Sequence, residues 1–461
     1  MKNVEEYREC IKGKKILVVG MGKSGMASVK VLKKLGAIVA IQDTKTEDEL
    51  EPSFGRYLEN EGICEKYFRC IPSQITEFDM IVLSPGVPTD LDWIRNAALA
   101  NVEVVGEFEL AYRLSKAEYV AITGTNGKTT TTTLVGDIFY AAGRRTSVVG
   151  NIGKAVISQA IDSNEGDWMV AEASSFQLET TKLFRPLVSA ILNLTPDHLN
   201  RHKTLEAYGE AKARINMNQT SDDYLVYNYD DKATIKLVEK CKARLVPFSR
   251  TKMLDYGAFV EDGKITIRDD ESSYQLCGVD ELKIIGNHNV ENALAAAAIS
   301  YFAGIDVETI SETLRKFPGV EHRIEFSGTV DDVRYYNDSK GTNVDAAVTA
   351  LKALKDNIIL IAGGDGKGQD FTELTRAFEG HVKSLILLGR DAPIIEKNAR
   401  DVGFDNIYNC KDMSACVAKA RELAVSGDKV LLSPACASWD MYDNYEQRGN
   451  HFKSCVEDML K

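Results

Sequence analysis

Hydrophobic positions along the chain form short apolar runs that alternate with longer amphipathic stretches. Runs such as "KILVVG" (15–20) and "DMIVLSPG" (79–86) are continuously apolar, which is typical of strands buried on both faces of a parallel sheet. Predicted helices follow them, one from Ser24 and one near Trp93. This alternation predicts an α/β protein whose sheets are covered by helices on both faces.

The same alternation recurs in three sections of the chain. The second section opens with "EYVAITGTNGKTTTT", and the third follows "FPGVEHRIEF", where Pro318-Gly319 interrupts the pattern. We therefore expect a Rossmann-like N-terminal domain, a central domain with a P-loop-like, mostly parallel sheet, and a Rossmann-like C-terminal domain. Their expected ranges are 1–107, 108–319 and 320–461.

Two stretches of the central section depart from this pattern. Short alternating runs between Asp222 and Asp280 predict a small antiparallel patch. The stretch "ALAAAAISYFAG" (293–304) is too short to span a bilayer and predicts a buried helix that begins at Asn289 or Glu291.

Composition and charge exclude some functions. A chain of 461 residues, 44% hydrophobic and 27% charged, has the composition of a soluble protein with several domains. Its net charge of −12 argues against a dedicated nucleic-acid-binding function, because phosphate backbones select basic surfaces. Nine scattered cysteines without a CxxC pair indicate reduced thiols in a cytoplasmic protein, and Cys436 in "SPACAS" has no evident partner base. The charged start "MKNVEEYREC" does not resemble a secretion signal.

A first glycine-rich loop follows the first predicted strand. Gly20, Gly22 and Gly25 have the GxGxxG spacing of a dinucleotide-binding loop. Asp43 closes the next strand, at the position where such proteins hold a ribose. This weak signal fits a nicotinamide-dependent dehydrogenase or a protein that binds another nucleotide.

A second glycine-rich turn, "AITGTNGKTTTTTLVG", is more specific. Gly124 and Gly127 allow backbone amides to turn toward an anion, and Lys128 and Thr129 follow at the start of the predicted helix. Amides, a helix N-terminus, a lysine and a hydroxyl that can bind magnesium form a phosphate cradle. The loop is shorter than GxxxxGK[ST], which would need glycine in place of Ile122. It predicts a nucleoside triphosphate site.

Glu172 and His198 follow two later predicted strands, in "VAEASSFQ" and "NLTPDHLNRH". Because ligands collect at the carboxyl ends of parallel strands, both side chains can face the Lys128 loop as metal-binding or catalytic groups. A solvated loop position for Glu172, and a capping or core role for His198, are the alternatives at this stage.

Ordered motifs extend over nearly the whole chain: "GMGKSG", "DTK", "SPGVP", "TGTNGKTT", "GNIG", "EASSFQLETT", "TPDHLNRH", "AKARI", "GNHNVENALAA", "GVEHRIE", "NDSKGTN", "GGDGKGQDF" and "SPACASWDMYDNYEQRG". Together they resemble the Mur ligases, the ATP-dependent amide ligases of bacterial cell-wall precursor synthesis. "SPGVP", "NDSKGTN" and the C-terminal block resemble the member that adds D-glutamate.

The resemblance implies a reaction and its partners. The γ-phosphate of ATP would be transferred to the L-alanine carboxylate of UDP-N-acetylmuramoyl-L-alanine. The amine of D-glutamate would then attack the acyl phosphate, and phosphate and ADP would leave. The N-terminal domain would hold the UDP group rather than a nicotinamide. We expect a cytoplasmic monomer that binds neither nucleic acid nor membrane.

This chemistry requires embedded positive charge. Two unit charges about 4 Å apart repel by roughly 4 kcal/mol at an effective dielectric constant near 20, so phosphorylation of a carboxylate needs cations. The resemblance implies Lys128 and two magnesium ions, with Thr129, Glu172, His198 and Lys212 in the metal region. An ammonium group at Lys212 would repel magnesium, and in this family carbon dioxide converts that lysine to a carbamate. An arbitrary helical lysine is more often solvated.

The resemblance also implies binding residues in each domain. The UDP-substrate contacts would be Lys23, Ser24, Thr44, Lys45 and Ser84, with Asn151 at the acyl end. The ATP contacts would be Gly124, Thr125, Asn126, Gly127, Lys128, Thr129, Thr130, Asn289, Asn292, Arg323, Asp338 and Lys340. Domain closure would complete that site, and Asn289 could equally be a helix cap. The D-glutamate contacts would be Thr342, Lys367, Ser438 and Tyr445.

Some features leave alternatives open. Tyr445 stands where the family pattern predicts Phe, and Ser438 and Tyr445 could simply pack a loop. A sister ligase that adds L-alanine, a diamino acid or a dipeptide, and a folate polyglutamate ligase, would share some motifs but not "NDSKGTN" with "SPACASWD". The intact Lys128 and Lys212 argue against a catalytically silent nucleotide-binding protein, and the third domain argues against a P-loop kinase.

Overall fold

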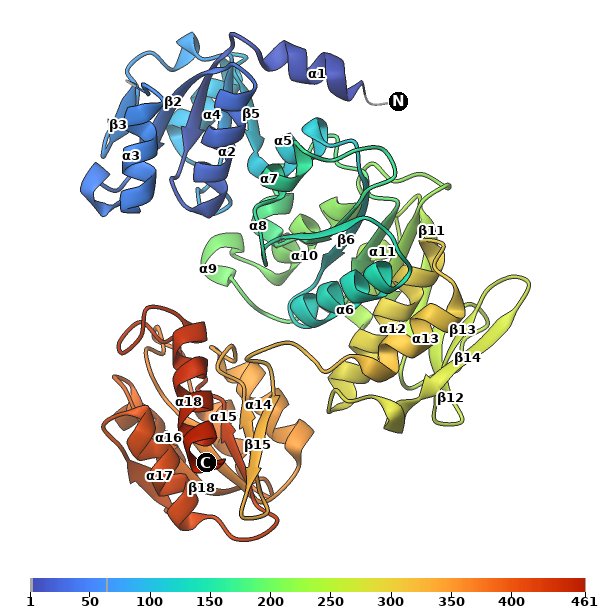
Figure 1. Cartoon of the computed structure of the whole chain (residues 1–461), viewed down its shortest axis with the longest axis vertical. Helices are drawn as coiled ribbons and strands as arrows, with labels where there is room; N and C mark the ends of the chain where they lie inside the picture. The colour runs from blue at the N-terminus through green and yellow to red at the C-terminus, as the bar shows by residue number, and fades with distance from the viewer. Residues whose placement is uncertain (1–2, 64, 461) are drawn as a thin grey trace. The chain divides into compact units, whose positions relative to one another are not determined.

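The computed structural model describes residues 3–63 and 65–460, which form three β-sheets flanked by helices (Figure 1). Contacts divide the chain into two compact units, residues 1–281 with 291–315 and residues 282–290 with 316–461. The first unit contains two sheets and the second contains the third. The predicted α/β class with mostly parallel sheets is confirmed.

The first sheet has five parallel strands in the order β3-β2-β1-β4-β5. The central strand β1 pairs with β2 and β4, so that Ile16 lies opposite Val39 and Met80. Its residues 16–19 are buried, as its apolar sequence predicts. The elements are α1 (Val4–Ile11), β1 (Lys15–Val19), α2 (Lys23–Lys34), β2 (Ile38–Asp43), η1 (Glu47–Glu49), α3 (Pro52–Asn60), β3 (Lys66–Phe68), η2 (Ile75–Glu77), β4 (Met80–Leu83), α4 (Asp92–Leu99), β5 (Glu103–Gly106) and α5 (Glu107–Leu114).

The central sheet has nine strands in the order β14-β13-β12-β11-β10-β9-β6-β8-β7. The antiparallel patch predicted between Asp222 and Asp280 is present only in the second half of that stretch, as β12, β13 and β14. The prediction was wrong for the first half, which holds the parallel strands β10 and β11. The patch extends the central sheet, because β12 pairs in parallel with β11 (Figure 1). The strands are β6 (Glu118–Thr123), β7 (Thr146–Gly150), β8 (Trp168–Glu172), β9 (Val188–Ile191), β10 (Tyr224–Asn228), β11 (Arg244–Ser249), β12 (Gly257–Glu261), β13 (Lys264–Arg268) and β14 (Ser273–Gly278).

Helices of this region follow most of the central strands. They are α6 (Lys128–Ala141), α7 (Val156–Ala160), α8 (Ser175–Leu178), α9 (Leu199–His202), α10 (Leu205–Ala213), η3 (Arg214–Asn216), α11 (Lys232–Val238), η4 (Val279–Glu281), α12 (Asn287–Phe302) and α13 (Val307–Lys316). The predicted buried helix is α12, and its residues 293–299 are buried. The predicted start at Asn289 or Glu291 was wrong, because the helix begins at Asn287.

The third sheet has the order β15-β16-β20-β17-β18-β19. Its strands are parallel except β15, which pairs with β16 as an antiparallel edge strand. The elements are β15 (Glu325–Val330), β16 (Val333–Asn337), α14 (Val344–Leu354), β17 (Ile358–Ala362), α15 (Thr372–Arg376), β18 (Val382–Leu387), α16 (Ala392–Asp401), β19 (Ile407–Asn409), α17 (Met413–Leu423), β20 (Lys429–Leu432) and α18 (Tyr445–Leu460).

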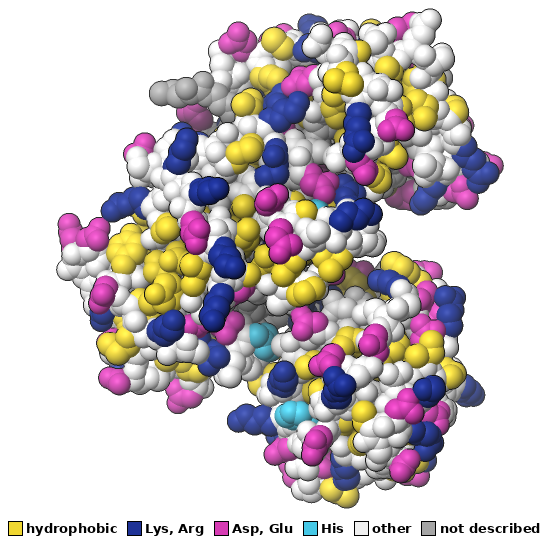
Figure 2. All heavy atoms as spheres, turned by 180° about the vertical axis from the view of Figure 1, so that it is seen from behind, with side chains coloured by type: hydrophobic (Ala, Val, Ile, Leu, Met, Phe, Trp, Pro, Cys, Tyr) yellow, Lys and Arg dark blue, Asp and Glu magenta, His cyan; other side chains and the backbone are white. Residues whose placement is uncertain are grey.

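The surface carries charges of both signs. On the face shown in Figure 2, Lys and Arg side chains lie interspersed with Asp and Glu side chains. Within residues 3–63 and 65–460, no helix is both long and apolar enough to cross a bilayer.

The buried carboxylate of Glu109 joins α5 to the segment before β9. It accepts hydrogen bonds from the amides of Lys182 and Leu183, both at 2.9 Å, and from Arg113 Nε at 2.8 Å. We expect Glu109→Ala to lower the free energy of unfolding by about 3–5 kcal/mol, because it leaves a buried guanidinium and backbone amides without their acceptor. Urea unfolding measures this loss.

Glu103 provides the matched control for this prediction. It pairs with the same guanidinium at 2.6 Å but is about one-third exposed. Glu103→Ala should cost less than about 1 kcal/mol, as expected of a solvent-screened pair. Equal losses for the two variants would contradict the assignment of Glu109 as the structural acceptor.

Candidate active site

The strand–turn–helix predicted for the second glycine-rich loop is present, since β6 ends at Thr123 and α6 begins at Lys128. Gly127 caps the helix with a left-handed φ of 82°. A Cβ atom at this position would lie 2.3 Å from Asn292 Oδ1, so the turn requires glycine for both conformation and space. Lys128 Nζ folds back over the loop and donates to the carbonyls of Gly124 (2.9 Å) and Thr125 (2.7 Å).

Two amides of this loop do not turn toward a ligand. The amides of Thr125 and Asn126 donate to Asn193 Oδ1 at 3.1 and 2.8 Å. The prediction that successive amides of the turn face an anion was therefore wrong for these two, because the protein satisfies them itself. Asn193 was missed by the sequence analysis, although it follows β9 in "NLTPDH". It stabilises the loop from the neighbouring strand.

Lys212 lies on α10 and is buried, with 1% of its surface exposed. Its Nζ donates to the carbonyl of Gly124 at 2.7 Å, so that it shares this acceptor with Lys128. Burial, and then the nearby Lys128 charge, lower the pKa of Lys212 well below its usual value. The alternative of a solvated helical lysine was wrong. This amine is held in conditions that favour its neutral form.

Glu172 ends β8 opposite Ile122 of β6, and its side chain is buried. Its Oε1 accepts a hydrogen bond from Asn151 Nδ2 at 2.8 Å. Its Oε2 is buried and has no hydrogen-bond partner among the described residues. The alternative of a solvated loop position was wrong. A buried carboxylate oxygen without a donor is a position where a cation would satisfy the charge.

His198 precedes α9 with a left-handed φ of 53°, which is unusual for a residue other than glycine. His198 occupies the N-cap position of α9, as the capping alternative held, although its side chain makes no capping hydrogen bond. The side chain is about half exposed, so the core alternative was wrong. The ring contacts Phe176 edge to face, with the ring centres 4.9 Å apart. The ring centres of His198 and Tyr208 are 6.3 Å apart. Lys212 Nζ lies 4.3 Å from the ring centre of Tyr208 on α10.

The donor near this loop is a carboxylate oxygen, which fits a hard, oxygen-ligated cation such as magnesium. Within the described part of the chain, no three His, Cys, Asp or Glu side chains are grouped as they would be around a metal ion. The free oxygen of Glu172 fits one position of an oxygen-ligated cation. Magnesium usually completes its shell with water and substrate phosphates, so few carboxylates suffice.

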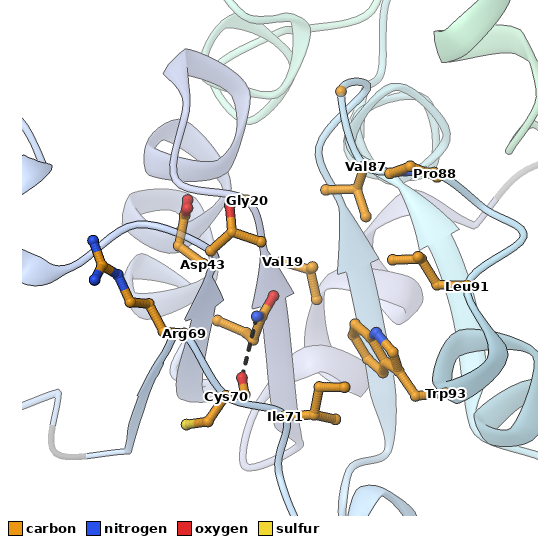
Figure 3. Close-up of a pocket in the computed structure, with 13 residues that line it drawn as sticks. Val19, Gly20, Asp43, Arg69, Cys70, Ile71, Val87, Pro88, Leu91 and Trp93 are labelled. Carbon is orange, nitrogen blue, oxygen red and sulfur yellow. Dashed lines mark hydrogen bonds between the residues drawn. The ribbon is translucent and has the colours of Figure 1, made fainter. Parts of the chain in front are cut away.

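The N-terminal sheet carries a cavity of about 540 Å³ at the carboxyl ends of its strands. Figure 3 shows Asp43, Arg69 and Cys70 on one side of it, and Val87, Leu91 and Trp93 on the other. The lining residues are Val19, Gly20, Gln42, Asp43, Thr44, Arg69, Cys70, Ile71, Gly86, Val87, Pro88, Leu91 and Trp93.

Of the predicted UDP contacts, only Thr44 is among the residues that line this cavity. Lys23 and Ser24 open α2 beside it, and Ser84 Oγ donates to the carbonyl of Gly20 at 2.6 Å. The carboxylate of Asp43 accepts hydrogen bonds from the amides of Met21 and Lys45. Asp43 therefore stabilises the glycine loop.

Arg69 and Trp93 were missed by the sequence analysis as pocket residues. Arg69 has a left-handed φ of 55° just after β3. Trp93 lies at the start of α4, beyond the "SPGVP" turn. Val87, Leu91 and Trp93 form an apolar side of the cavity. The sequence signal for it is an aromatic residue shortly after the "SPGVP" turn.

The second unit brings together several of the predicted ATP and D-glutamate contacts. Asp338 is buried and accepts from Ser433 Oγ at 2.6 Å, and burial raises its pKa to about 7. Lys340 Nζ lies 5.3 Å from the ring centre of Tyr445. Lys367 Nζ lies 4.6 Å from that of Trp439, an exposed residue missed by the sequence analysis.

The other predicted contacts take several positions. Asn289 lies within α12 and donates to the carbonyl of Ile285 at 2.7 Å, so the helix-cap alternative was wrong. Asn292 Oδ1 accepts from Thr131 Oγ1 at 3.3 Å. Arg323 has a buried Nε without a hydrogen-bond partner among the described residues. Thr342 is half-buried in the loop before α14.

Arg448 on α18 connects the loops of the C-terminal site and was also missed. Its guanidinium is buried and donates to the Ser339 carbonyl at 2.9 Å and the Cys436 carbonyl at 3.0 Å. Ser438 is buried nearby, and its carbonyl accepts from the amide of Tyr442 at 2.8 Å. Burial raises the pKa of the Cys436 thiol to about 12, which argues against a nucleophile.

Asp338 gives a pH-dependent stability that can be measured. Its folded-state pKa of about 7 exceeds the ordinary value of 3.8, so the native state keeps a proton that the unfolded state has lost. This contribution is fully present below pH 4 and is lost as the pH rises through 7. Chemical unfolding at each pH should show that Asp338→Asn removes this decline.

Asp356→Asn is the control of opposite sign. Asp356 is exposed, and its hydrogen bond from Lys429 lowers its pKa, so its contribution is lost as the pH falls. A wild-type protein and an Asp338→Asn variant with parallel stability profiles from pH 4 to 8 would contradict a buried, protonated Asp338.

The fold and the site together define a class: an α/β protein with a phosphate-binding loop in a central sheet and two further α/β modules. The sequence profiles of three domains match the chain: "Mur ligase MurD-like, N-terminal domain" at 14–106, "Mur ligase middle domain" at 122–300 and "Mur ligase, glutamate ligase domain" at 322–436. The chain belongs to the Mur ligase family.

Relatives extend the match over nearly the whole chain. A UDP-N-acetylmuramoylalanine–D-glutamate ligase of Thermoanaerobacter pseudethanolicus is 48% identical, covering 98% of this chain and 100% of its own length. A protein of the same name from Clostridioides difficile is 47% identical over 97% of this chain and 99% of its own.

Solved structures share the fold at lower identity. The UDP-N-acetylmuramate-alanine ligase of Thermotoga maritima has a TM-score of 0.61 at 21% identity, covering 96% of this chain and 99% of that one. A pseudomurein peptide ligase type C from Methanothermus fervidus has a TM-score of 0.59 at 19% identity, covering 97% of this chain and all of that one.

Proposed function

We propose that this chain is an ATP-dependent ligase that joins D-glutamate to UDP-N-acetylmuramoyl-L-alanine in peptidoglycan precursor synthesis. Relatives that carry the name of this activity match nearly end to end. The observation that carries the chemistry is the convergence of Lys128 and Lys212 on one carbonyl, that of Gly124, beside the buried carboxylate of Glu172. Embedded charges of both signs at a glycine-rich loop suit a phosphoryl group and its cation.

In this proposal, Lys128 offsets the repulsion between the γ-phosphate and the L-alanine carboxylate. Transfer of the phosphoryl group gives an acyl phosphate and ADP. The D-glutamate amine attacks the acyl carbon, the tetrahedral intermediate expels phosphate, and an amide bond remains. Glu172, Thr129 and His198 would hold magnesium, which supplies electrostatic stabilisation of the transferred phosphoryl group. Asn151 keeps one oxygen of Glu172 engaged and leaves the other available.

Lys212 has the properties of a lysine that carbon dioxide can modify. Attack on CO₂ requires the neutral amine, and burial beside Lys128 lowers the pKa of Lys212 in this direction. Attack of the neutral amine on CO₂ forms a carbamate, releases one proton and leaves an anion with two oxygens. Such a group would remove the repulsion between this side chain and two magnesium ions.

Substrate contacts follow the three proposed domains, 1–107, 108–319 and 320–461. The N-terminal cavity, with Thr44 and the neighbouring Lys23, Ser24, Lys45 and Ser84, would take the UDP group. The "TGTNGKTT" loop, with Asn289, Asn292, Arg323, Asp338 and Lys340, would bind ATP. Thr342, Lys367, Ser438 and Tyr445 would recognise D-glutamate, where lysine supplies the charge that a dicarboxylate requires.

The decisive experiment measures ATP-dependent phosphate release with UDP-N-acetylmuramoyl-L-alanine, with and without D-glutamate. We expect release that requires both substrates, and a product whose mass equals the acceptor plus glutamate minus water. A screen over L-alanine, diaminopimelate and D-glutamate, each with its matched acceptor, separates this activity from that of a sister ligase. Consumption of diaminopimelate with D-glutamate ignored would overturn the proposal.

We also propose that the protein acts as a cytoplasmic monomer. The described cysteines form no disulfide, which supports a cytoplasmic location, and the net charge of −12 disfavours self-association. Light scattering of the purified chain, with and without its nucleotide substrates, measures the oligomeric state. A stable dimer would contradict it.

A further inference from the structure

Arg201 on α9 connects the N-terminal cavity to the central sheet through its guanidinium group. Its Nη1 donates to the carbonyl of Pro85 at 3.3 Å, and its Nη2 donates to that of Val87 at 3.2 Å. The same group pairs with Glu179, through Nη2 to Oε2 at 2.5 Å and Nε to Oε1 at 3.3 Å. Only 16% of the Arg201 side chain is exposed, so this fork is largely shielded from solvent.

The two carbonyls belong to the "SPGVP" turn that forms one wall of the N-terminal cavity. Val87 lines the cavity, and Figure 3 shows its side chain at that wall. The turn packs tightly against the glycine loop, since a Cβ atom at Gly20 would lie 2.9 Å from Val87 Cγ2. Ser84 Oγ donates to the carbonyl of Gly20 at 2.6 Å. Because the turn is held to the glycine loop in this way, a shift of the turn moves the cavity as a whole.

On its other side, Arg201 stabilises the segment that carries His198. Its guanidinium lies over the ring of Phe176 at 4.4 Å, and Phe176 contacts the ring of His198. The backbone amide of Arg201 donates to the carbonyl of His198 at 3.0 Å. His202, the next residue, stacks on Phe176 and bonds to Ser175. One side chain thus touches both the cavity wall and the His198 loop.

We propose that Arg201 is a positioning residue that sets the cavity for the UDP group relative to the His198 loop, so that the far end of the substrate reaches the phosphate loop. This inference rests on the proposed function, because only a substrate that spans both places needs their relative position. Errors of about 1 Å in such a position can cost 10²-fold in rate.

The chemistry of the contact requires arginine rather than any cation. The guanidinium directs donors from one plane to a carboxylate and to two carbonyls at once. A lysine can keep the pairing with Glu179, but it cannot make both carbonyl bonds in this geometry. Arg201→Lys should therefore retain folding and lose part of the positioning effect.

Arg8 supplies a matched control with the same exposure. Its side chain is also 16% exposed, and it donates to the carbonyls of Leu114 (2.6 Å) and Ile161 (3.0 Å) at a different place in the same unit. Arg8→Ala removes a comparable buried guanidinium without touching the "SPGVP" turn. It reports what loss of stability alone does to the kinetics.

The experiment compares wild type, Arg201→Ala, Arg201→Lys and Arg8→Ala in steady-state kinetics for each substrate, and measures the Kd of UDP and of UDP-N-acetylmuramoyl-L-alanine. For Arg201→Ala we expect KM for the UDP substrate to rise about 10-fold or more and kcat to fall about 10- to 100-fold. KM for ATP and the Kd of UDP alone should stay within about threefold. Arg201→Lys should lie between wild type and Arg201→Ala.

Three results would overturn the proposal: equal losses of affinity for UDP and the full substrate, a parallel rise in KM for ATP, or Arg8→Ala kinetics that match Arg201→Ala. The first would make Arg201 a part of the cavity wall only. If Arg201→Ala does not fold, the test rests on Arg201→Lys. Kinetic constants of Arg201→Lys equal to those of wild type would then overturn the proposal. Failure of the proposed function appears separately, as a wild type without D-glutamate-dependent turnover.

Discussion

Replacement of Lys212 by alanine should lower turnover by about 10³-fold, because loss of a group that supports a catalytic metal removes several kcal/mol of transition-state stabilisation. The side chain is buried, donates to the carbonyl of Gly124 at 2.7 Å and has a pKa well below its usual value. If Lys212 were an ammonium ion, its positive charge would repel both Lys128 and a magnesium ion. Its neutral form can instead react with carbon dioxide and give a carboxylate-like group.

The test uses turnover and a direct spectroscopic signal. Short carboxylic acids such as acetate should partly restore activity in Lys212→Ala, because they can supply the missing anionic oxygens. Wild-type protein equilibrated with ¹³CO₂ should show a carbamate resonance that is absent from the variant. Lys236→Ala on α11 is the control, since Lys236 is exposed and should change neither readout. Full activity of Lys212→Ala without added acid would contradict the proposal.

Replacement of Lys128 by methionine should also lower turnover by about 10³-fold, because the charge that offsets two anions is lost. A second effect follows from the shared carbonyl of Gly124. Lys128 helps to lower the pKa of Lys212, so its removal should raise that pKa. More of the Lys212 amine is then protonated at a given pH, and its carbamate should form only at higher pH.

Kinetics and the ¹³CO₂ signal together test this coupling. Measured between pH 6 and 9, the carbamate signal of Lys128→Met should be shifted to higher pH than that of wild type. Thr133→Ala, a half-buried position on the same helix, serves as the control for damage to α6. An unchanged carbamate profile in Lys128→Met would show that the two lysines do not interact, even if turnover is lost.

Local patterns were sufficient for much of the fold. Continuous apolar runs correctly predicted β1, β6 and β8. Strands that are buried on both faces have apolar side chains at successive positions, so a continuous run identifies them. The start of α12 was less well predicted, since the helix begins at Asn287 and a second asparagine, Asn289, follows two residues later without any local feature that distinguishes the two as helix starts. The stretch from Asp222 to Asp280 was predicted as one antiparallel patch, because short alternating runs do not show whether neighbouring strands pair in parallel. Only β12 to β14 are antiparallel, whereas β10 and β11 pair in parallel.

The candidate site divides in the same way. Gly127 and Lys128 were evident from their spacing, because a glycine-rich turn followed by lysine at a helix N-terminus is a recurring phosphate-binding arrangement. Asn193, Arg201 and Arg448 were not, because each acts through hydrogen bonds to backbone groups far away in sequence. The sequence around a single polar residue does not show which distant backbone group it will bind.

The sequence by itself determined the α/β class, the phosphate-binding loop and the family, because these depend on periodicity and on residue types at fixed spacing. Only the tertiary structure decided which charges meet. Lys212 lies 88 positions from the carbonyl it binds, and Glu172 has one oxygen held by Asn151 and one without a partner among the described residues. Burial, shared acceptors and pKa shifts are properties of groups brought together by the packing of the sheet and its helices, and no local pattern specifies them.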